Sequence, residues 1–587
     1  MRWISTLRTC LPLFLGLMVG LSCSNAPADA TKYDLAGLWQ SQRIFGPTAS
    51  GPILIRKSGN GLLAEIGGHR VEVIREENEV KFALSDGSRF EGEFEDNGNI
   101  RGSWLQPRSR LDGNIFATPV RLLRQADGWR GVITPQPDTG TFYLLLTMQD
   151  AGLTAEMINP ERNLGVFNQL STVEREGNTL SIMGRFRGRG EERLMFRGDY
   201  HANEDVIALR YPGRGGAYDF HRVSPDIANG FLARRAASEI SFTPPPSLGD
   251  GWDTASPDEV GIDVEIIDQM IRTHVLEPPT NTHDLSVHAI LVARYGKLVF
   301  EEYFHGFHRN LPHDSRSASK SVTSILAAAV MRSGADLAWD TPVYPIFDTA
   351  ELLQQEPQRK EIEMQHLMNM NSGLDCDDRD SESAANEDYL WDHADELDFY
   401  RHTLGVDVVR PPGELAKYCS ASANLAGGAI AAAADQSLLR LLDRLVAEPM
   451  DINRYSVPNS PDGHPFMGGG IRWMPRDFLK FPQLLLDDGV WNGHRVLSSR
   501  DAKRLITPAV TIDGGRDYGY LWWTEDYPFR GGSVRAHFMG GNGGQIAMLV
   551  PELQLSIVFN AGNYSDRVMF RIQEELIPDF VLPSILD

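Results

Sequence analysis

A run of three prolines, Pro244–Pro246, divides this 587-residue chain into two parts with different sequence patterns. Proline lacks a backbone N–H group, so the run cannot continue a helix or an inner strand. Residues 31–241 alternate in the manner of short strands, whereas residues 264–587 mix helical and strand patterns. A chain of this length exceeds one compact core. We therefore predict a β-rich domain at 31–241, a linker at 242–263 and an α/β domain at 264–587.

The β-rich part contains a pattern that occurs twice. Val73–Asn78 recurs as Val173–Asn178, and Phe90–Phe94 recurs as Phe196–Tyr200. A duplicated β-meander, packed as a barrel or a sandwich, explains the recurrence. The alternative is that unrelated meanders share the same alternation. No residue here points to chemistry, so ligand binding, docking and spacing from a membrane all remain open roles for this part.

Overall composition excludes several classes of protein. Hydrophobic residues make up 42% and charged residues 23%, as in soluble globular proteins. The formal charge of −23 repels a phosphate backbone, so we expect no nucleic-acid partner.

The first 30 residues predict export from the cytosol. Arginines precede an apolar run, Leu11–Leu21, which is shorter than the ~20 residues that a membrane-spanning helix needs. Two processing sites compete. Ala28–Ala30 fits ordinary signal cleavage, whereas Leu21–Cys23 resembles a bacterial lipobox, which would put a lipid on Cys23. We expect a periplasmic protein or a lipoprotein anchored to the outer membrane.

The body of the chain contains two cysteines, Cys376 and Cys419. Outside the cytosol a disulfide between them would persist. Two buried free thiols are the alternative.

The sharpest local motif is Ser317-Ala318-Ser319-Lys320, which leads into an apolar helical pattern over 320–331. This spacing places Ser317 and Lys320 on one helix face, about one turn apart. The first turn of a helix favours negative charge, so Ser317 can attack a carbonyl there while its N–H group helps to hold the oxyanion. Lys320 can accept the serine proton if its surroundings keep it neutral. The alternative is a serine N-cap followed by an exposed lysine.

Two further segments are candidates for the same site. Tyr418 precedes a helix of small residues expected over 425–434, where a phenol oxygen can shuttle a proton. The glycine-rich segment His537–Gln545 runs into an expected strand at 546–550 and lets a ligand approach the backbone closely. A packed aromatic and a hairpin turn are the respective alternatives.

These motifs belong to a longer series: Leu291–Lys297, Ser317–Ser321, Asp340–Val343, His366–Leu374, Tyr418–Ser420, Gly468–Asp477, Tyr518–Trp523 and Gly541–Gln545. In this order, over roughly residues 250–587, the chain resembles the serine β-lactamase and penicillin-binding-protein superfamily. It is most similar to the branch of esterases and 6-aminohexanoate-dimer-hydrolase-like serine hydrolases.

The resemblance implies a C-terminal antiparallel sheet flanked by helices, with Ser317 at a helix start beside a helical sub-domain. It also implies an acyl-serine mechanism without a cofactor, acting on a small ester or amide. Ser317 would be the nucleophile, Lys320 the base and Tyr418 the relay to the leaving group. The backbone N–H groups of Ser317 and of Asn542, which follows Gly541, would form the oxyanion hole.

The chain departs from the family pattern at two motifs. Ser420 stands where the family often has Asn, and Met539–Gly541 replaces a Lys-Thr-Gly triplet that holds the carboxylate of a β-lactam. These departures favour an ester or small amide over a β-lactam. A non-catalytic ligand- or peptidoglycan-binding protein, and a D-aminopeptidase or β-lactamase, are the alternatives.

Two clusters of polar residues are assigned no chemistry. His305, His308 and His313 precede the serine motif, but we expect a solvated loop there and no metal. Residues 375–400 are rich in Asp and Glu. We expect them to form a charged surface segment near the cleft.

Overall fold

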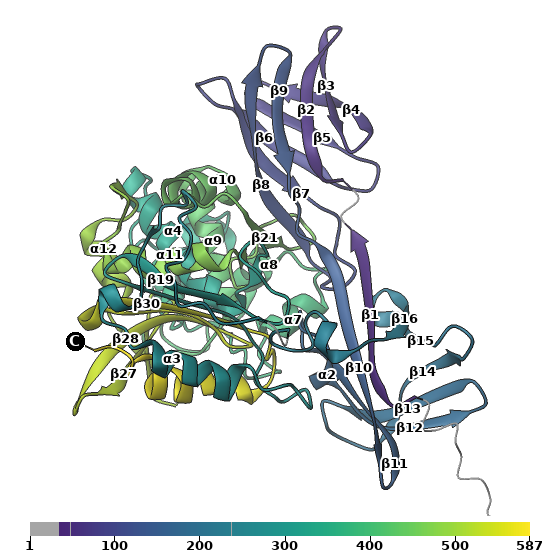
Figure 1. Cartoon of the computed structure of the whole chain (residues 1–587). Coiled ribbons are helices and arrows are strands. Elements are labelled where there is room, and N and C mark those ends of the chain that lie inside the picture. The colour runs from purple at the N-terminus through teal and green to yellow at the C-terminus, as the bar shows by residue number, and fades with distance from the viewer. Residues whose placement is uncertain (1–34, 47–48, 236–237, 513, 587) are drawn as a thin grey trace, which may run out of the picture.

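The computed structural model describes residues 35–46, 49–235, 238–512 and 514–586. These residues form two eight-stranded barrels, followed by a nine-stranded sheet with helices on both faces (Figure 1). The expected architecture, an all-β N-terminal part and a C-terminal domain of sheet and helices, is confirmed. The predicted leader, with Cys23, lies outside the described residues.

The first barrel uses one strand from the start of the chain and a run of strands from later in it. Around the barrel the order is β1, then β10 to β16, and β16 pairs with β1 to close the ring. Its interior is filled by buried apolar side chains such as Trp39, Phe142 and Leu180. The strands are β1 (Gly37–Gly46), β10 (Asp138–Gln149), β11 (Gly152–Ile158), β12 (Asn168–Glu176), β13 (Thr179–Phe186), β14 (Arg193–His201), β15 (Val206–Tyr211) and β16 (Gly216–Arg222).

The second barrel is inserted between β1 and β10. Its strands follow one another as a meander, and β9 pairs with both β2 and β8, which closes the ring. Phe90, Trp104 and Ile100 are among the side chains that fill it. The strands are β2 (Gly51–Ser58), β3 (Gly61–Ile66), β4 (His69–Glu76), β5 (Glu79–Ala83), β6 (Arg89–Phe94), β7 (Ile100–Leu105), β8 (Ile115–Gln125) and β9 (Gly128–Ile133).

Each barrel contains an equivalent hydrogen bond at the place where the sequence repeats. Phe94 N–H donates to the Asn78 carbonyl at 2.9 Å, and Tyr200 N–H donates to the Asn178 carbonyl at 2.7 Å. Each asparagine follows the strand that begins the repeat, β4 in one barrel and β12 in the other. This equivalence supports a duplicated meander. A short helix, α2 (Leu164–Phe167), interrupts the second copy and is too short to produce a helical period in the sequence.

The sheet of the second barrel continues into the C-terminal domain. Strand β8 pairs with β21 (Tyr455–Asn459), which pairs with β22 (Arg472–Trp473). Strand β22 in turn pairs with β20 (His313–Asp314), directly upstream of the serine motif. The N-terminal and C-terminal parts are therefore joined by backbone hydrogen bonds.

The main sheet of the C-terminal domain has the order β17-β19-β18-β30-β29-β28-β27-β26-β25. Its neighbours are antiparallel, as expected, except for the short parallel pair of β17 and β19. The strands are β17 (Asp253–Thr254), β18 (Val287–Arg294), β19 (Lys297–Tyr303), β25 (Val510–Ile512), β26 (Arg516–Gly519), β27 (Trp522–Phe529), β28 (Gly532–Gly541), β29 (Gln545–Val550) and β30 (Leu555–Ala561).

Helices cover both faces of this sheet (Figure 1). Helix α11 packs on β18, β29 and β30, and α4 packs against α9, while α3 lies on the opposite face. Among the described residues, no helix has the length and apolar character to cross a bilayer. The helices are α3 (Val264–Met270), α4 (Lys320–Ser333), α5 (Ala350–Gln355), α6 (Met364–Met368), α7 (Glu387–Asp392), α8 (Phe399–Gly405), α9 (Ser420–Ala434), α10 (Leu438–Leu442), α11 (Pro475–Leu486) and α12 (Ser499–Leu505).

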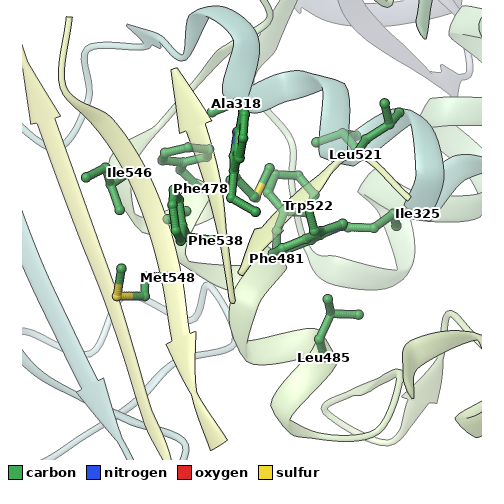
Figure 2. Close-up of a cluster of buried hydrophobic side chains, with 14 of the residues drawn as sticks. Ala318, Ile325, Phe478, Phe481, Leu485, Leu521, Trp522, Phe538, Ile546 and Met548 are labelled. Atoms are coloured by element: carbon green, nitrogen blue, oxygen red, sulfur yellow. The ribbon is translucent and has the colours of Figure 1, made fainter. Parts of the chain in front are cut away.

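The start of α4 is anchored in the main hydrophobic core. Ala318, Ile325, Phe478 and Phe538 belong to one buried cluster that links α4, α11 and the sheet (Figure 2). All of α4 from Lys320 to Val330 is buried. Tight packing of this kind resists displacement, so the segment that carries the serine motif rests on a rigid base.

Candidate active site

Ser317 and Lys320 meet at the start of α4. Ser317 lies in a 3₁₀ turn over Arg316–Ser319, and Lys320 is the first residue of the helix. Lys320 Nζ donates a hydrogen bond to Ser317 Oγ at 3.0 Å. Ser317 remains half-buried, whereas only 1% of Lys320 is exposed. The lysine is therefore not the exposed surface residue of the alternative interpretation.

The charge on Lys320 differs from the neutral amine that the sequence suggested. Burial lowers its pKa, but the Tyr418 oxygen and the carboxylates of Glu387 and Asp378 raise the pKa above its ordinary value. Negative groups close to an ammonium favour its charged form. The resting site thus holds an ammonium that donates to Ser317.

Tyr418 reaches the same place from a distant part of the chain. Lys320 Nζ lies 5.0 Å from the centroid of the Tyr418 ring. The Tyr418 ring stacks on Trp523, with centroids 5.8 Å apart and planes 16° apart. Stacking fixes the ring plane and keeps the ring beside the lysine.

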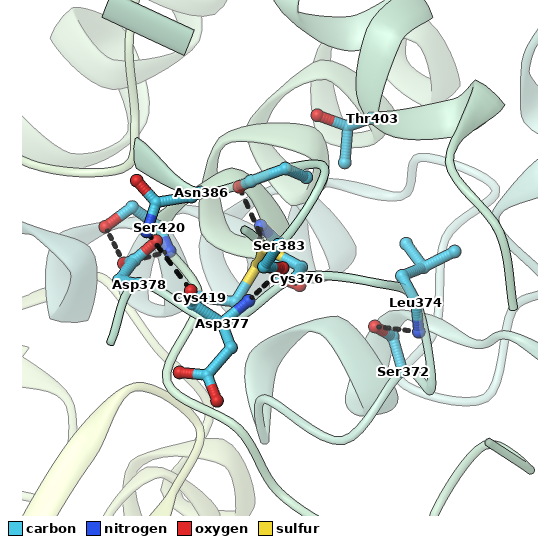
Figure 3. The surroundings of a disulfide bond; sticks show 12 residues. Ser372, Leu374, Cys376, Asp377, Asp378, Ser383, Asn386, Thr403, Cys419 and Ser420 are labelled. Atoms are coloured by element: carbon cyan, nitrogen blue, oxygen red, sulfur yellow. Dashed lines mark hydrogen bonds between the residues drawn. A yellow bond between two sulfur atoms is a disulfide. The ribbon is translucent and has the colours of Figure 1, made fainter. Parts of the chain in front are cut away.

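A disulfide lies directly beside Tyr418. The sulfur atoms of Cys376 and Cys419 are bonded, and the Cα atoms are 5.5 Å apart (Figure 3). The Tyr418 carbonyl also accepts the N–H of Asp378 at 2.8 Å. The bond therefore ties the segment that carries Tyr418 to the acidic segment near the cleft.

The glycine-rich hairpin between β28 and β29 packs against the turn that carries Ser317. A Cβ atom on Gly541 would lie 2.3 Å from the Ser315 carbonyl oxygen and 3.1 Å from the Ala318 nitrogen. Only glycine allows this close approach. The Asn542 side chain is held by the N–H of Ser565, which donates to Oδ1 at 2.7 Å. Ser317, Tyr418, Gly541 and Asn542 all line one cleft of about 360 Å³.

Ser420 binds two carboxylates at the start of α9. Its Oγ lies 2.7 Å from Asp378 Oδ2 and 2.6 Å from Glu387 Oε2 (Figure 3 shows the Asp378 contact). A hydroxyl carries one hydrogen, so one of the two contacts requires a proton on a carboxyl group. Burial and the neighbouring Glu387 raise the pKa of Asp378 to about 6, against the opposing effect of Lys320. Below about pH 6 Asp378 therefore carries a proton close to Lys320.

Other lining residues of the cleft were missed from the sequence. Asp378 and Arg379 come from the acidic segment, and Arg516 and Trp523 come from β26 and β27. The guanidinium of Arg516 lies 4.5 Å from the Trp523 ring centroid. Trp523 ends the motif Tyr518–Trp523, whereas Asp378, Arg379 and Arg516 had no signal apart from the general acidity of residues 375–400.

The histidines before the serine motif do not form a solvated loop. His305 and His313 are buried and only His308 is exposed. His313 Nε2 lies 2.8 Å from Nδ1 of His288, a partner in β18 that the sequence did not suggest. Burial lowers the pKa of both His305 and His313 to about 4, so these rings are neutral near pH 7. In the described part of the chain, no group of His, Cys, Asp or Glu side chains is arranged to hold a metal ion.

Comparison with known proteins identifies the family of the C-terminal domain. The Beta-lactamase family model matches residues 272–561, which confirms the resemblance seen in the motifs. No curated protein matches the chain.

Several solved structures are similar at low identity. A candidate beta-lactamase from Bacteroides dorei DSM 17855 is 18% identical and covers 55% of this chain and 99% of its own, with a TM-score of 0.44. A candidate 6-aminohexanoate-dimer hydrolase from Bacillus anthracis is 17% identical and covers 58% and 87%, with a TM-score of 0.43. A family VIII carboxylesterase is 13% identical and covers 57% and 98%, with a TM-score of 0.41. Such similarity transfers no activity to this chain.

Proposed function

Residues 272–561 form a Beta-lactamase domain, and from that premise we propose that the protein is an exported serine hydrolase. It cleaves an ester or small amide through an acyl-serine intermediate on Ser317. One observation carries the proposal: Lys320 Nζ contacts Ser317 Oγ at 3.0 Å and the Tyr418 ring lies directly beside the same ammonium. A hydroxyl that lines the cleft, with an ammonium and a phenol next to it, supplies the parts that acyl transfer requires.

We assign a role to each group. Tyr418, whose ring lies beside the Lys320 ammonium, takes the role of proton relay and receives the Ser317 proton. Ser317 Oγ then attacks the substrate carbonyl, and the N–H groups of Ser317 and Asn542 hold the oxyanion. The proton passes from Tyr418 to the leaving group, which departs. Water attacks the acyl group by the reverse proton path and restores Ser317.

A fluorophosphonate probe tests the nucleophile directly. We expect covalent labelling of the purified, folded protein and no labelling of Ser317→Ala. A folded wild-type protein that resists the probe would favour the non-catalytic binding protein. Hydrolysis of short-chain p-nitrophenyl esters then distinguishes an esterase from a peptidase.

A substrate with a carboxylate, such as a D-peptide or a β-lactam, is the second candidate. Arg379 and Arg516 both line the cleft, so cations are present there although the third motif lacks its lysine. A guanidinium matches a carboxylate in geometry. If this candidate holds, Arg516→Met raises KM for D-peptides or β-lactams and leaves KM for neutral esters unchanged.

Export is part of the proposal. The disulfide between Cys376 and Cys419 suits an oxidising compartment, in line with the expected leader. Mass spectrometry of the mature N-terminus tests the route. A diacylated Cys23 supports a lipoprotein, an N-terminus after Ala30 supports ordinary secretion, and an uncleaved cytosolic chain contradicts export.

A further inference from the structure

The strand that leads to the nucleophile belongs to a sheet that begins in the N-terminal part. Strand β20 ends at Asp314, and the hydrogen-bonded series β20, β22, β21 and β8 connects it to the second barrel. The N-terminal part is therefore in direct contact with the segment that positions Ser317.

Five charged side chains gather at this contact, and we call them the junction cluster: Asp112, Arg162, Asp314, Arg316 and Arg472. Arg162 lies between β11 and β12 of the first barrel, and Asp112 lies between β7 and β8 of the second. Arg162 Nη1 is 3.2 Å from Asp112 Oδ1 and 3.3 Å from Asp314 Oδ2. Arg472 also pairs with Asp112, and its Nη2 lies 3.8 Å from Asp314 Oδ2.

Asp314 in turn holds the residue that precedes the nucleophile. Its Oδ1 accepts the N–H of Arg316 at 2.9 Å. Arg316 has a φ of 50°, a left-handed conformation that is uncommon for a residue other than glycine. Its carbonyl accepts the Gly470 N–H at 3.0 Å and the Ser319 hydroxyl at 2.8 Å. Backbone in this region persists only where its surroundings hold it.

Three arginines keep Asp314 ionised despite its burial. Burial favours the neutral acid, but Arg316, Arg472 and Arg162 together lower the pKa of Asp314 to about 2. Only 4% of the Asp314 side chain and 13% of the Arg162 side chain is exposed. Loss of one arginine therefore leaves a buried carboxylate with fewer partners, a change that favours its rearrangement.

We propose that Arg162 is a positioning residue for the nucleophile. It holds Asp314, so that Arg316 keeps the conformation that directs Ser317 into the cleft. This inference rests on the proposed function, and it gives the N-terminal part a direct role in the reaction. Arg162 does not line the substrate cleft, so its loss changes kcat and leaves KM unchanged.

The position of Arg162 also makes it suitable for substitution. Together with Asp112, Asp314 and Arg472 it borders a separate cavity of about 310 Å³ between the first barrel and the C-terminal domain. A shorter side chain there enlarges an existing space and opens no new void in a packed core.

The test compares Arg162→Met with a matched control. Arg101 is also a buried arginine of the N-terminal part that binds the C-terminal domain, with contacts of 2.7 Å to Asp443 and 2.6 Å to Glu448. Neither Asp443 nor Glu448 belongs to the junction cluster or lines the cleft. We expect Arg162→Met to lower kcat for a p-nitrophenyl ester, and the rate of fluorophosphonate labelling, by about 10- to 100-fold. Arg101→Met lowers the melting temperature and keeps kcat.

Further variants separate positioning from folding. Arg162→Lys retains the cation and restores a large part of kcat, and Asp112→Asn lowers kcat in the same direction as Arg162→Met. If Arg162→Met does not fold, these two variants decide between the outcomes. If Arg162→Met and Asp112→Asn both fold and have the kcat of the wild type, the role of Arg162 is overturned. An equal loss of kcat in Arg101→Met would overturn it as well. An unlabelled wild-type protein would instead contradict the proposed function itself.

Discussion

The disulfide beside Tyr418 provides a perturbation whose size can be worked out from the chain. Cys376 and Cys419 are separated by 43 positions. Closing a loop of this length removes conformational freedom from the unfolded chain, and the loop-entropy relation gives about 4 kcal/mol of stabilisation at 25 °C. The double variant Cys376→Ser/Cys419→Ser, which leaves no unpaired thiol at this site, should lose about that amount of the free energy of unfolding of the C-terminal domain.

Guanidinium unfolding followed by loss of esterase activity measures this change. The wild-type protein should lose stability when a reductant is added, and the double variant should not respond to it. Thiol titration must show that both sulfur atoms have been released in the reduced sample. A fully reduced wild-type protein with an unchanged unfolding midpoint would refute the entropy argument.

Three other perturbations act on the cleft. Gly541→Ala places a methyl group against the Ser315 carbonyl and should displace the proposed oxyanion hole. We expect kcat to fall by about 10²- to 10³-fold, with a smaller effect on the melting temperature. An unchanged kcat would contradict the assignment of the oxyanion hole. Tyr418→Phe should lower kcat by about 10²- to 10⁴-fold, and near-full activity would exclude Tyr418 as the proton acceptor. The folded-state pKa of Asp378 is about 6, above its ordinary 3.8. Between about pH 4 and 6 the folded protein therefore binds more protons than the unfolded chain does. Its stability falls as the pH rises through this range. Asp378→Asn should flatten this fall in melting temperature, and an identical pH profile would contradict the shift.

The parts of the site set by local periodicity could be predicted from the sequence. A helical turn fixes the distance between Ser317 and Lys320, so their spacing alone placed them on one face. Tyr418 is far away in the chain, and only its place in the ordered series of family motifs connected it to the serine. The contacts of Ser420 with Asp378 and Glu387 had no local signal in the sequence. Nothing in the acidic segment distinguishes Asp378, which lines the cleft, from Asp380 and Glu382, which are exposed.

The fold shows the same division between local and long-range information. Alternation predicted strands throughout residues 31–241, because alternation reports one buried face of a strand. Alternation does not show which strands pair with each other. The insertion of the second barrel between β1 and β10, and the contact of β8 with β21, join residues that are distant in sequence. Strands as short as β20 and β22 show no period at all, although Asp314 of β20 pairs with Arg162 and Arg472 of β22 pairs with Asp112.

The histidine segment shows why burial is difficult to predict from residue type alone. A group of histidines between polar neighbours resembles a solvated loop, yet His313 lies in β20 and bonds to His288 of β18. The neutral form of a histidine is easily buried when another group satisfies its nitrogen atoms. That partner is remote in sequence, so no local pattern reveals it.

Trapping the acyl-enzyme tests the central claim most directly. The protein is mixed with excess p-nitrophenyl ester, quenched in acid within the first turnovers, digested and mapped by mass spectrometry. We predict an acyl adduct on the peptide that contains Ser317, with the modification on Ser317 itself, and a burst of p-nitrophenol of matching amount. Turnover of the ester without an adduct on Ser317, or an adduct on another residue that persists in Ser317→Ala, would contradict the account.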